Sequence, residues 1–232
     1  MKFRRKKSEQ AEAQAADPVE TPEVPQQGAP SADAASRAAG AAGDRVGGPF
    51  DVSEVELDEE DPTRVDLGGL IVKGRSGIEM RLQVDEASQQ VAAVLLVGAE
   101  GALELRPFAA PRNGDIWGDV RKQIAAETAR RGGTATEAEG TFGTELRVMM
   151  PVKTPEGKAA TQPSRVLGIA GPRWLLRATF LGRPAVESDD EGDLESALRD
   201  VVVVRGSSPM APGEPLPLVM PSNARPAPAQ DS

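Results

Sequence analysis

The fold class follows from one stretch of sequence, Val91-Ala-Ala-Val-Leu-Leu-Val-Gly-Ala-Glu-Gly-Ala-Leu-Glu-Leu-Arg-Pro-Phe108. Its first part, 91–97, is apolar throughout, which is typical of a strand covered on both faces. Its last part, 102–108, alternates apolar and polar residues, which is the pattern of a half-buried strand. The connection between the two is a four-residue turn, 98–101, and so short a connection favours antiparallel pairing.

The upstream sequence extends this antiparallel meander by at least one strand. Residues 78–84 alternate cleanly between apolar and polar side chains, and the apolar residues 70–72 lead into them through a glycine-flanked turn at 74–77. Downstream the apolar period changes to that of a helix, which is expected over 115–131. Its apolar stripe consists of Ile116, Val120 and Ile124. Either Asn113 or Asp115 can cap its start, and two glycines at 132–133 end it.

The rest of the chain completes an α+β domain. Further strands are expected at 134–139, 145–151, 165–169 and 174–181, and a closing helix at 193–204. The resulting prediction is a mainly antiparallel sheet of about seven strands, packed by two helices, with disordered tails at both ends.

Composition divides the chain into three parts. Residues 1–48 begin with five basic side chains in the first seven positions and continue as an Ala-, Pro- and Glu-rich stretch that cannot bury enough apolar surface to fold. Residues 49–206 form the predicted single domain. Residues 207–232 are Pro-rich and are expected to form a strap followed by a loose tail.

The residue types that are missing exclude several kinds of chemistry. The chain has 232 residues with no His, no Cys and no Tyr, so it has no imidazole base, no thiol nucleophile, no zinc finger and no disulfide. Its net charge of −9 argues against a general nucleic-acid coat. No long apolar run follows the basic start, so we expect a cytoplasmic protein without a transmembrane segment, and we expect no cofactor.

Two runs of sequence resemble a known family. They are Leu103-Glu-Leu-Arg-Pro-Phe-Ala-Ala-Pro-Arg-Asn-Gly-Asp-Ile-Trp117 and Gly171-Pro-Arg-Trp-Leu-Leu-Arg-Ala-Thr-Phe-Leu-Gly182. Together with 161–165 and 200–205 they are similar to an uncharacterised actinobacterial family, domain of unknown function 3710, over roughly 48–220. The resemblance implies a bacterial cytoplasmic protein and no particular activity. The order of elements is also similar to the antiparallel sheets of the PsbP and Mog1 kind, a likeness that implies fold and not function.

The candidate binding residues are arginines beside glycine turns. Arg106, Arg112, Asn113 and Gly114 lead into the expected helix, whose N-terminal N–H groups attract anions. The alternative is structural: Asn113 caps the helix while the arginines pair with Glu104 or Asp119. Arg173 and Arg177 share one face of the strand 174–181 and form a second candidate wall for a ligand, with solvated arginines as the alternative.

Three function classes remain open. The preferred one is a non-enzymatic binding domain that recognises a protein partner or a small anion. The second is a carboxylate- or metal-dependent hydrolase or transferase, for which Asp115 and Asp119 lie one helical turn apart, although no metal ligand set is placed. The third is a tether whose basic start, Lys2–Lys7, contacts lipid or RNA. The acidic runs 54–61 and 187–195 are expected to be solvated segments.

Overall fold

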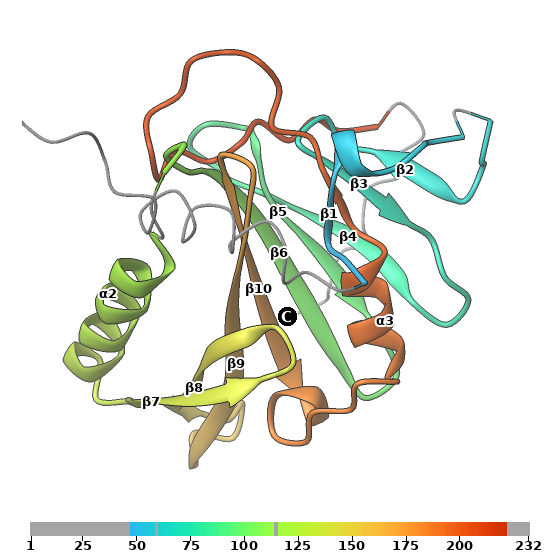
Figure 1. Cartoon of the computed structure of the whole chain (residues 1–232). Helices are drawn as coiled ribbons and strands as arrows, with labels where there is room; N and C mark the ends of the chain where they lie inside the picture. The colour runs from blue at the N-terminus through green and yellow to red at the C-terminus, as the bar shows by residue number, and fades with distance from the viewer. Residues whose placement is uncertain (1–46, 59, 114–115, 222–232) are drawn as a thin grey trace, which may run out of the picture.

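The computed structural model describes residues 47–58, 60–113 and 116–221. Its largest element is a seven-stranded sheet in the order β4-β5-β6-β10-β9-β8-β7, in which all neighbours are antiparallel. The strands are β4 (Glu79–Val84), β5 (Val91–Val97), β6 (Gly101–Ala109), β7 (Thr134–Gly140), β8 (Gly143–Lys153), β9 (Ala159–Gly171) and β10 (Trp174–Gly182). The predicted α+β class with an antiparallel sheet of about seven strands is confirmed (Figure 1).

The meander expected from the opening stretch is present. β4, β5 and β6 are consecutive neighbours, and the turn between β5 and β6 is closed by the Gly98 N–H, which donates to the Gly101 carbonyl at 2.9 Å. In this register Leu96 pairs with Leu103, and both side chains point into the core. A tight turn also joins β9 to β10, where Arg173 adopts a left-handed backbone conformation with φ of 62°.

A second, smaller sheet was not predicted. It has the order β1-β11-β3-β2, formed by β1 (Phe50–Asp51), β2 (Arg64–Asp66), β3 (Leu70–Lys73) and β11 (Val202–Val203). The residues 70–72 therefore belong to this sheet and not to the meander. The expected closing helix over 193–204 is wrong at its end, because helix α3 stops at Arg199 and Val202–Val203 form a strand. Four consecutive β-branched residues, Val201–Val204, favour an extended backbone over another helical turn.

The described part of the chain contains two α-helices, which lie on opposite faces of the large sheet (Figure 1). Helix α2 (Trp117–Arg130) packs over β7, β8 and β9. Helix α3 (Asp193–Arg199) lies on the other face, near the small sheet. There are also two short 3-10 helices: η1 (Val52–Glu54) directly follows β1, and η2 (Arg183–Ala185) directly follows β10. Helix α2 begins two residues later than predicted, and Ile116 occupies its N-cap position without a side-chain capping hydrogen bond. The predicted cap Asn113 therefore lies before the helix start, and the alternative cap, Asp115, lies outside the described residues.

Each face of the large sheet has its own core. The larger core joins both sheets and α3 around Trp174, which is fully buried. The smaller core lies beneath α2 around Trp117. The indole of Trp117 rests on Gly168 of β9 so closely that a Cβ there would lie 2.2 Å from the ring, and its N–H donates to the Thr144 carbonyl at 2.7 Å. This glycine sets how closely α2 approaches the sheet.

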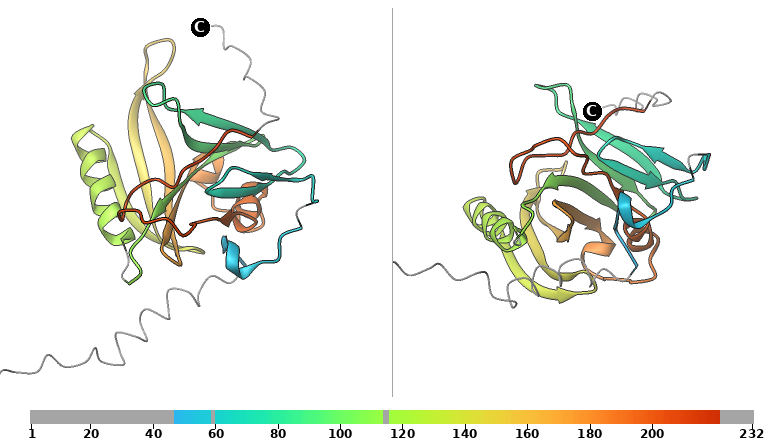
Figure 2. Two further views of the ribbon diagram at one scale, coloured as in Figure 1. Left: turned by 90° about the horizontal axis from the view of Figure 1, so that it is seen from above. Right: turned by 45° about the horizontal axis from the view of Figure 1, so that its top comes forward.

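The segment after β11 crosses the end of the large sheet as an extended strap, residues 207–221 (Figure 2). β5 pairs with β6 only from Ala102 to Leu105, and further along β6 the strap takes the place of β5. There the Leu216 N–H donates to the Pro107 carbonyl at 2.9 Å. Leu216 and Leu218 are buried between their prolines, so the strap contributes to the larger core.

Candidate functional site

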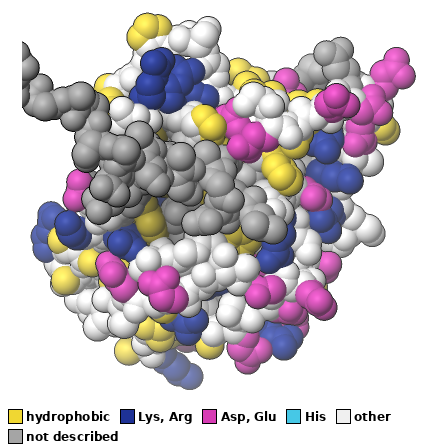
Figure 3. Space-filling model, viewed as in Figure 1, with side chains coloured by type: hydrophobic (Ala, Val, Ile, Leu, Met, Phe, Trp, Pro, Cys, Tyr) yellow, Lys and Arg dark blue, Asp and Glu magenta, His cyan; other side chains and the backbone are white. Residues whose placement is uncertain are grey.

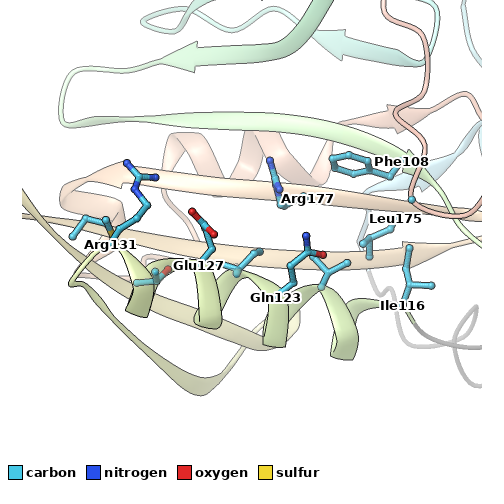
Figure 4. Close-up of a pocket in the computed structure, with 12 residues that line it drawn as sticks. Phe108, Ile116, Gln123, Glu127, Arg131, Leu175 and Arg177 are labelled. Carbon is cyan, nitrogen blue, oxygen red and sulfur yellow. The ribbon is translucent and has the colours of Figure 1, made fainter.

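A groove runs between α2 and the face of the large sheet that α2 covers (Figure 4). It encloses about 490 Å³. Residues from β6, β8, β10, α2 and the strap line it, and they are Phe108, Ile116, Val120, Gln123, Ile124, Glu127, Thr128, Arg131, Met150, Leu175, Arg177 and Gly213. Helix α2 leaves part of this sheet face uncovered, since it packs over β7, β8 and β9 and leaves β4, β5 and β6 to one side. The groove lies at the border between the covered and the open parts.

The floor of the groove is apolar for a reason already visible in the sequence. The predicted stripe of Ile116, Val120 and Ile124 faces the sheet, as expected for an amphipathic helix. Leu175 of β10 is paired in register with Phe108 of β6, so both side chains stand on the same face. The isoleucines and the valine thus form the apolar helix side of the groove, and Leu175 and Phe108 form its apolar sheet side.

Arg177 is the half-buried charge in this floor. It follows Leu175 on the same face of β10, and its guanidinium lies 5.3 Å from the centre of the Phe108 ring. It forms no ion pair or hydrogen bond with any residue that the structure describes. Burial lowers the pKa of Arg177, the neighbouring charge of Arg106 lowers it further, and Glu104 opposes both effects. An arginine remains charged in spite of such a shift, so the floor carries a positive charge that lacks a carboxylate partner.

The helix side of the groove carries polar groups. Figure 4 shows Gln123 and Glu127 projecting from successive turns of α2, with Arg131 at the C-cap position just after the helix. Glu127 pairs with Arg130, outside the groove, at 3.2 Å. Arg131 is exposed and forms no ion pair within the described residues. Because the charged lining residues are two arginines and one glutamate, the lining carries one net positive charge.

The structure places the sequence-predicted site residues in separate locations. Arg106 pairs with Glu104 at 2.9 Å, as the structural alternative expected, and does not line the groove. Arg112 and Asn113 are exposed in the loop before α2, and Gly114 lies outside the described residues. Arg173 donates to the Gly206 carbonyl at 3.2 Å, which ties the β9–β10 turn to the start of the strap. Among the members of the predicted set that the structure describes, Arg177 alone lines the groove.

The acidic run 187–195 is not simply solvated, which corrects the sequence-based expectation for it, whereas no described residue of 54–61 is buried. Glu195 of α3 is 2% exposed and pairs with Arg165 of β9, which is 3% exposed. Arg165 also lies 3.6 Å from the buried Glu145 of β8, and it covers the Phe180 ring at 4.2 Å. Just before the other acidic run, Asp51 accepts a hydrogen bond from the buried Trp174 indole at 2.7 Å. Glu195 thus anchors the run 187–195 to the domain, and Asp51 anchors the residues that precede 54–61.

The structure describes one of the two aspartates considered for the metal-dependent alternative. Asp119 is almost fully exposed and pairs with Lys122 at 3.5 Å, while Asp115 lies outside the described residues. Within 47–58, 60–113 and 116–221, no group of three or more acidic side chains is arranged to hold a metal ion. The basic start, Lys2–Lys7, also lies outside the described residues.

The surface has no dominant sign of charge on the face shown in Figure 3, where acidic and basic side chains of the described residues are interspersed. Such a mixture differs from the basic stripe expected of a nucleic-acid-binding face. Among the described residues, neither α2 nor α3 is long and apolar enough to cross a membrane.

Comparisons with known proteins identify a family without a described activity. No curated protein matches the chain. A crystal structure from Bacteroides thetaiotaomicron is similar at 10% identity and a TM-score of 0.35, over 59% of this chain and 46% of that one, so this chain spans less than half of that protein's length. So weak a likeness carries no argument. The model of the family described as "Protein of unknown function (DUF3710)" matches residues 48–227, a range that includes both sheets, both helices and the strap, and the chain belongs to this family.

Proposed function

We propose that this protein is a ligand-binding domain and that the groove between α2 and the large sheet is its binding site. The observation that carries the proposal is the apolar floor with a few polar groups at its edges, which is the usual composition of a small-molecule site. Its volume of about 490 Å³ falls within the range of about 300–1,000 Å³ typical of such sites. We therefore favour a small molecule with an apolar body over a protein partner.

The elements that form the groove support the same reading. Its walls come from strands, a helix of about four turns and a strap that is hydrogen-bonded to β6, so the site is preformed. By contrast, the acid pair considered for catalysis is represented in the described residues by one exposed aspartate, Asp119. As part of the proposal the domain acts in the cytoplasm, and cell fractionation tests that location.

The test is to block the groove from its helix side. Gln123 is exposed and lines the groove, so Gln123→Trp places an indole across it without disturbing the core. We expect the fluorescence of Nile red, an uncharged dye that brightens in apolar sites, to rise with the full chain and to lose most of that rise in Gln123→Trp. The matched control is Ala129→Trp, which is exposed on α2 but outside the groove and should leave the rise intact. An equal loss in both variants, or no rise at all, contradicts the proposal.

A further inference from the structure

We infer that the ligand of this groove is an amphipathic organic monoanion, whose carboxylate binds the guanidinium of Arg177 while its apolar chain lies along α2. The inference rests on the proposed function and adds the chemical class of the ligand. It follows from three features of the described residues: the state of Arg177, the position of the apolar floor, and the total charge of the lining.

The first feature is a half-buried guanidinium that lacks an anionic partner. The nearby acid, Glu104, pairs with Arg106 at 2.9 Å and so is engaged by a different cation. Other arginines at comparable or greater depth have partners: Arg165 pairs with two glutamates, and Arg205 donates to the Arg173 and Ser208 carbonyls at 3.1 Å. A partly desolvated charge without a partner costs free energy, and an anionic ligand would remove that cost. Arginine also offers the paired N–H groups that fit a carboxylate.

The second feature is the position of this charge beside the apolar floor. Leu175 and Arg177 lie two residues apart on the same face of β10, and Phe108 packs beside both. Figure 4 shows Arg177 on the sheet side with Leu175 and Ile116 further along the groove. A ligand with its head at Arg177 can therefore lay an apolar chain over Leu175 toward the stripe of α2. This juxtaposition selects an amphiphile over a small inorganic anion.

The third feature is the charge of the lining, which selects a single negative charge. The charged lining residues are two arginines, Arg131 and Arg177, and one glutamate, Glu127, which gives the lining one net positive charge, and Glu127 also pairs with Arg130 outside the groove. Figure 4 places Glu127 between the two arginines along the groove. A dianion such as a phosphate monoester would bring its second charge close to this carboxylate, whereas a carboxylate would not.

The test compares octanoate with 1-octanol, which share a chain length and differ in charge, by NMR titration of the ¹⁵N-labelled full chain. We expect octanoate to bind about tenfold or more tightly than octanol, as a hydrogen-bonded charge pair would produce. Arg177→Gln should abolish that preference by weakening octanoate binding, and Arg177→Lys should retain part of it. Arg81→Gln removes the same charge elsewhere on the sheet, where Arg81 pairs with Glu79 at 2.8 Å, and should leave the preference unchanged.

The outcomes separate this inference from the proposed function. If Nile red binds and Gln123→Trp blocks it, while Arg177→Gln leaves the octanoate preference intact, the monoanion inference is wrong and the groove remains a binding site. The same conclusion follows if octanol binds as tightly as octanoate. If neither the dye nor either octyl compound binds, the proposed function fails and the inference fails with it.

Discussion

At the level of single residues, the ion pairs around Arg165 show how a buried charge is made tolerable in this fold. Arg165 joins Glu145 of β8 and Glu195 of α3, all of them at most 3% exposed, and donates as well to the Pro184 carbonyl at 3.1 Å. The exposed Arg147 adds a second cation at 3.3 Å from Glu145. The two arginines therefore balance the charge of the two carboxylates. This balance is needed because a buried charge without a partner carries a large desolvation cost.

Breaking this network should destabilise the protein strongly. We expect Arg165→Met to lower the free energy of unfolding by about 3–5 kcal/mol, because it leaves two buried carboxylates without their shared partner. Arg183→Met is the control, since its pairs with Glu100 and Glu187 are exposed and should be worth less than about 1 kcal/mol. Urea unfolding measures both. Similar losses in the two variants would show that the buried network contributes no more than surface pairs do.

Residue-scale contacts were the hardest features to predict from the sequence. Alternation placed Arg177 on the same strand face as Leu175, and the structure agrees. Alternation could not predict that the Arg173 side chain would instead donate a hydrogen bond to the Gly206 carbonyl. That contact depends on the left-handed backbone conformation of Arg173 and on the path of the chain into the strap. Likewise Glu195 sits in an acidic run that resembles a solvated surface, and its burial depends on Arg165, thirty positions away in the sequence.

At the level of elements, the strap is the segment whose contribution to the core was hardest to predict from the amino-acid composition. Its prolines predicted an extended segment, but they did not show that the leucines between them would enter the core. The reason is non-local: β5 and β6 separate beyond Leu105, and the strap pairs with the part of β6 left free. The short strands β1, β2 and β11 escaped prediction for the same reason, since each is two or three residues long and depends on partners far along the chain.

The strap should therefore contribute directly to stability. Leu216 is 2% exposed, and we expect Leu216→Ala to lower the free energy of unfolding by about 2–5 kcal/mol through lost burial and the cavity left behind. Val219→Ala lies three residues further on the same strap but is 53% exposed, so its effect should stay within about 0.5 kcal/mol. Urea unfolding of both variants gives the comparison. A mild effect of Leu216→Ala would mean that the strap only rests on a domain that is stable without it.

At the level of the whole molecule, the sequence predicted the class of fold and missed the arrangement that creates the groove. The helix 115–131 and most strands were recognisable because their apolar periods are local. The strand order is not local: β10 lies between β6 and β9, which brings Phe108 beside Leu175 and Arg177. The groove needs this order together with α2 and the strap, so no single stretch of sequence could reveal it.

The arrangement of the two cores predicts how the whole molecule unfolds. The larger core contains buried residues from both sheets, α3 and the strap, so the small sheet has no separate core of its own. The two cores share strands β9 and β10, whose opposite faces they cover. We therefore expect the described domain to unfold in one cooperative step.

The two tryptophans make this expectation testable core by core, because Trp174 lies in the larger core and Trp117 in the smaller one. In the full chain with Trp117→Phe, fluorescence reports the larger core, and in Trp174→Phe it reports the smaller one. Within each variant, the fluorescence transition in urea should coincide with the loss of far-ultraviolet circular dichroism, even if the substitution moves both midpoints. A fluorescence midpoint that departs from the circular dichroism midpoint in either variant would mean that the faces of the sheet unfold separately. Coincident transitions in both would show that α2, and with it one wall of the groove, persists as long as the sheet does.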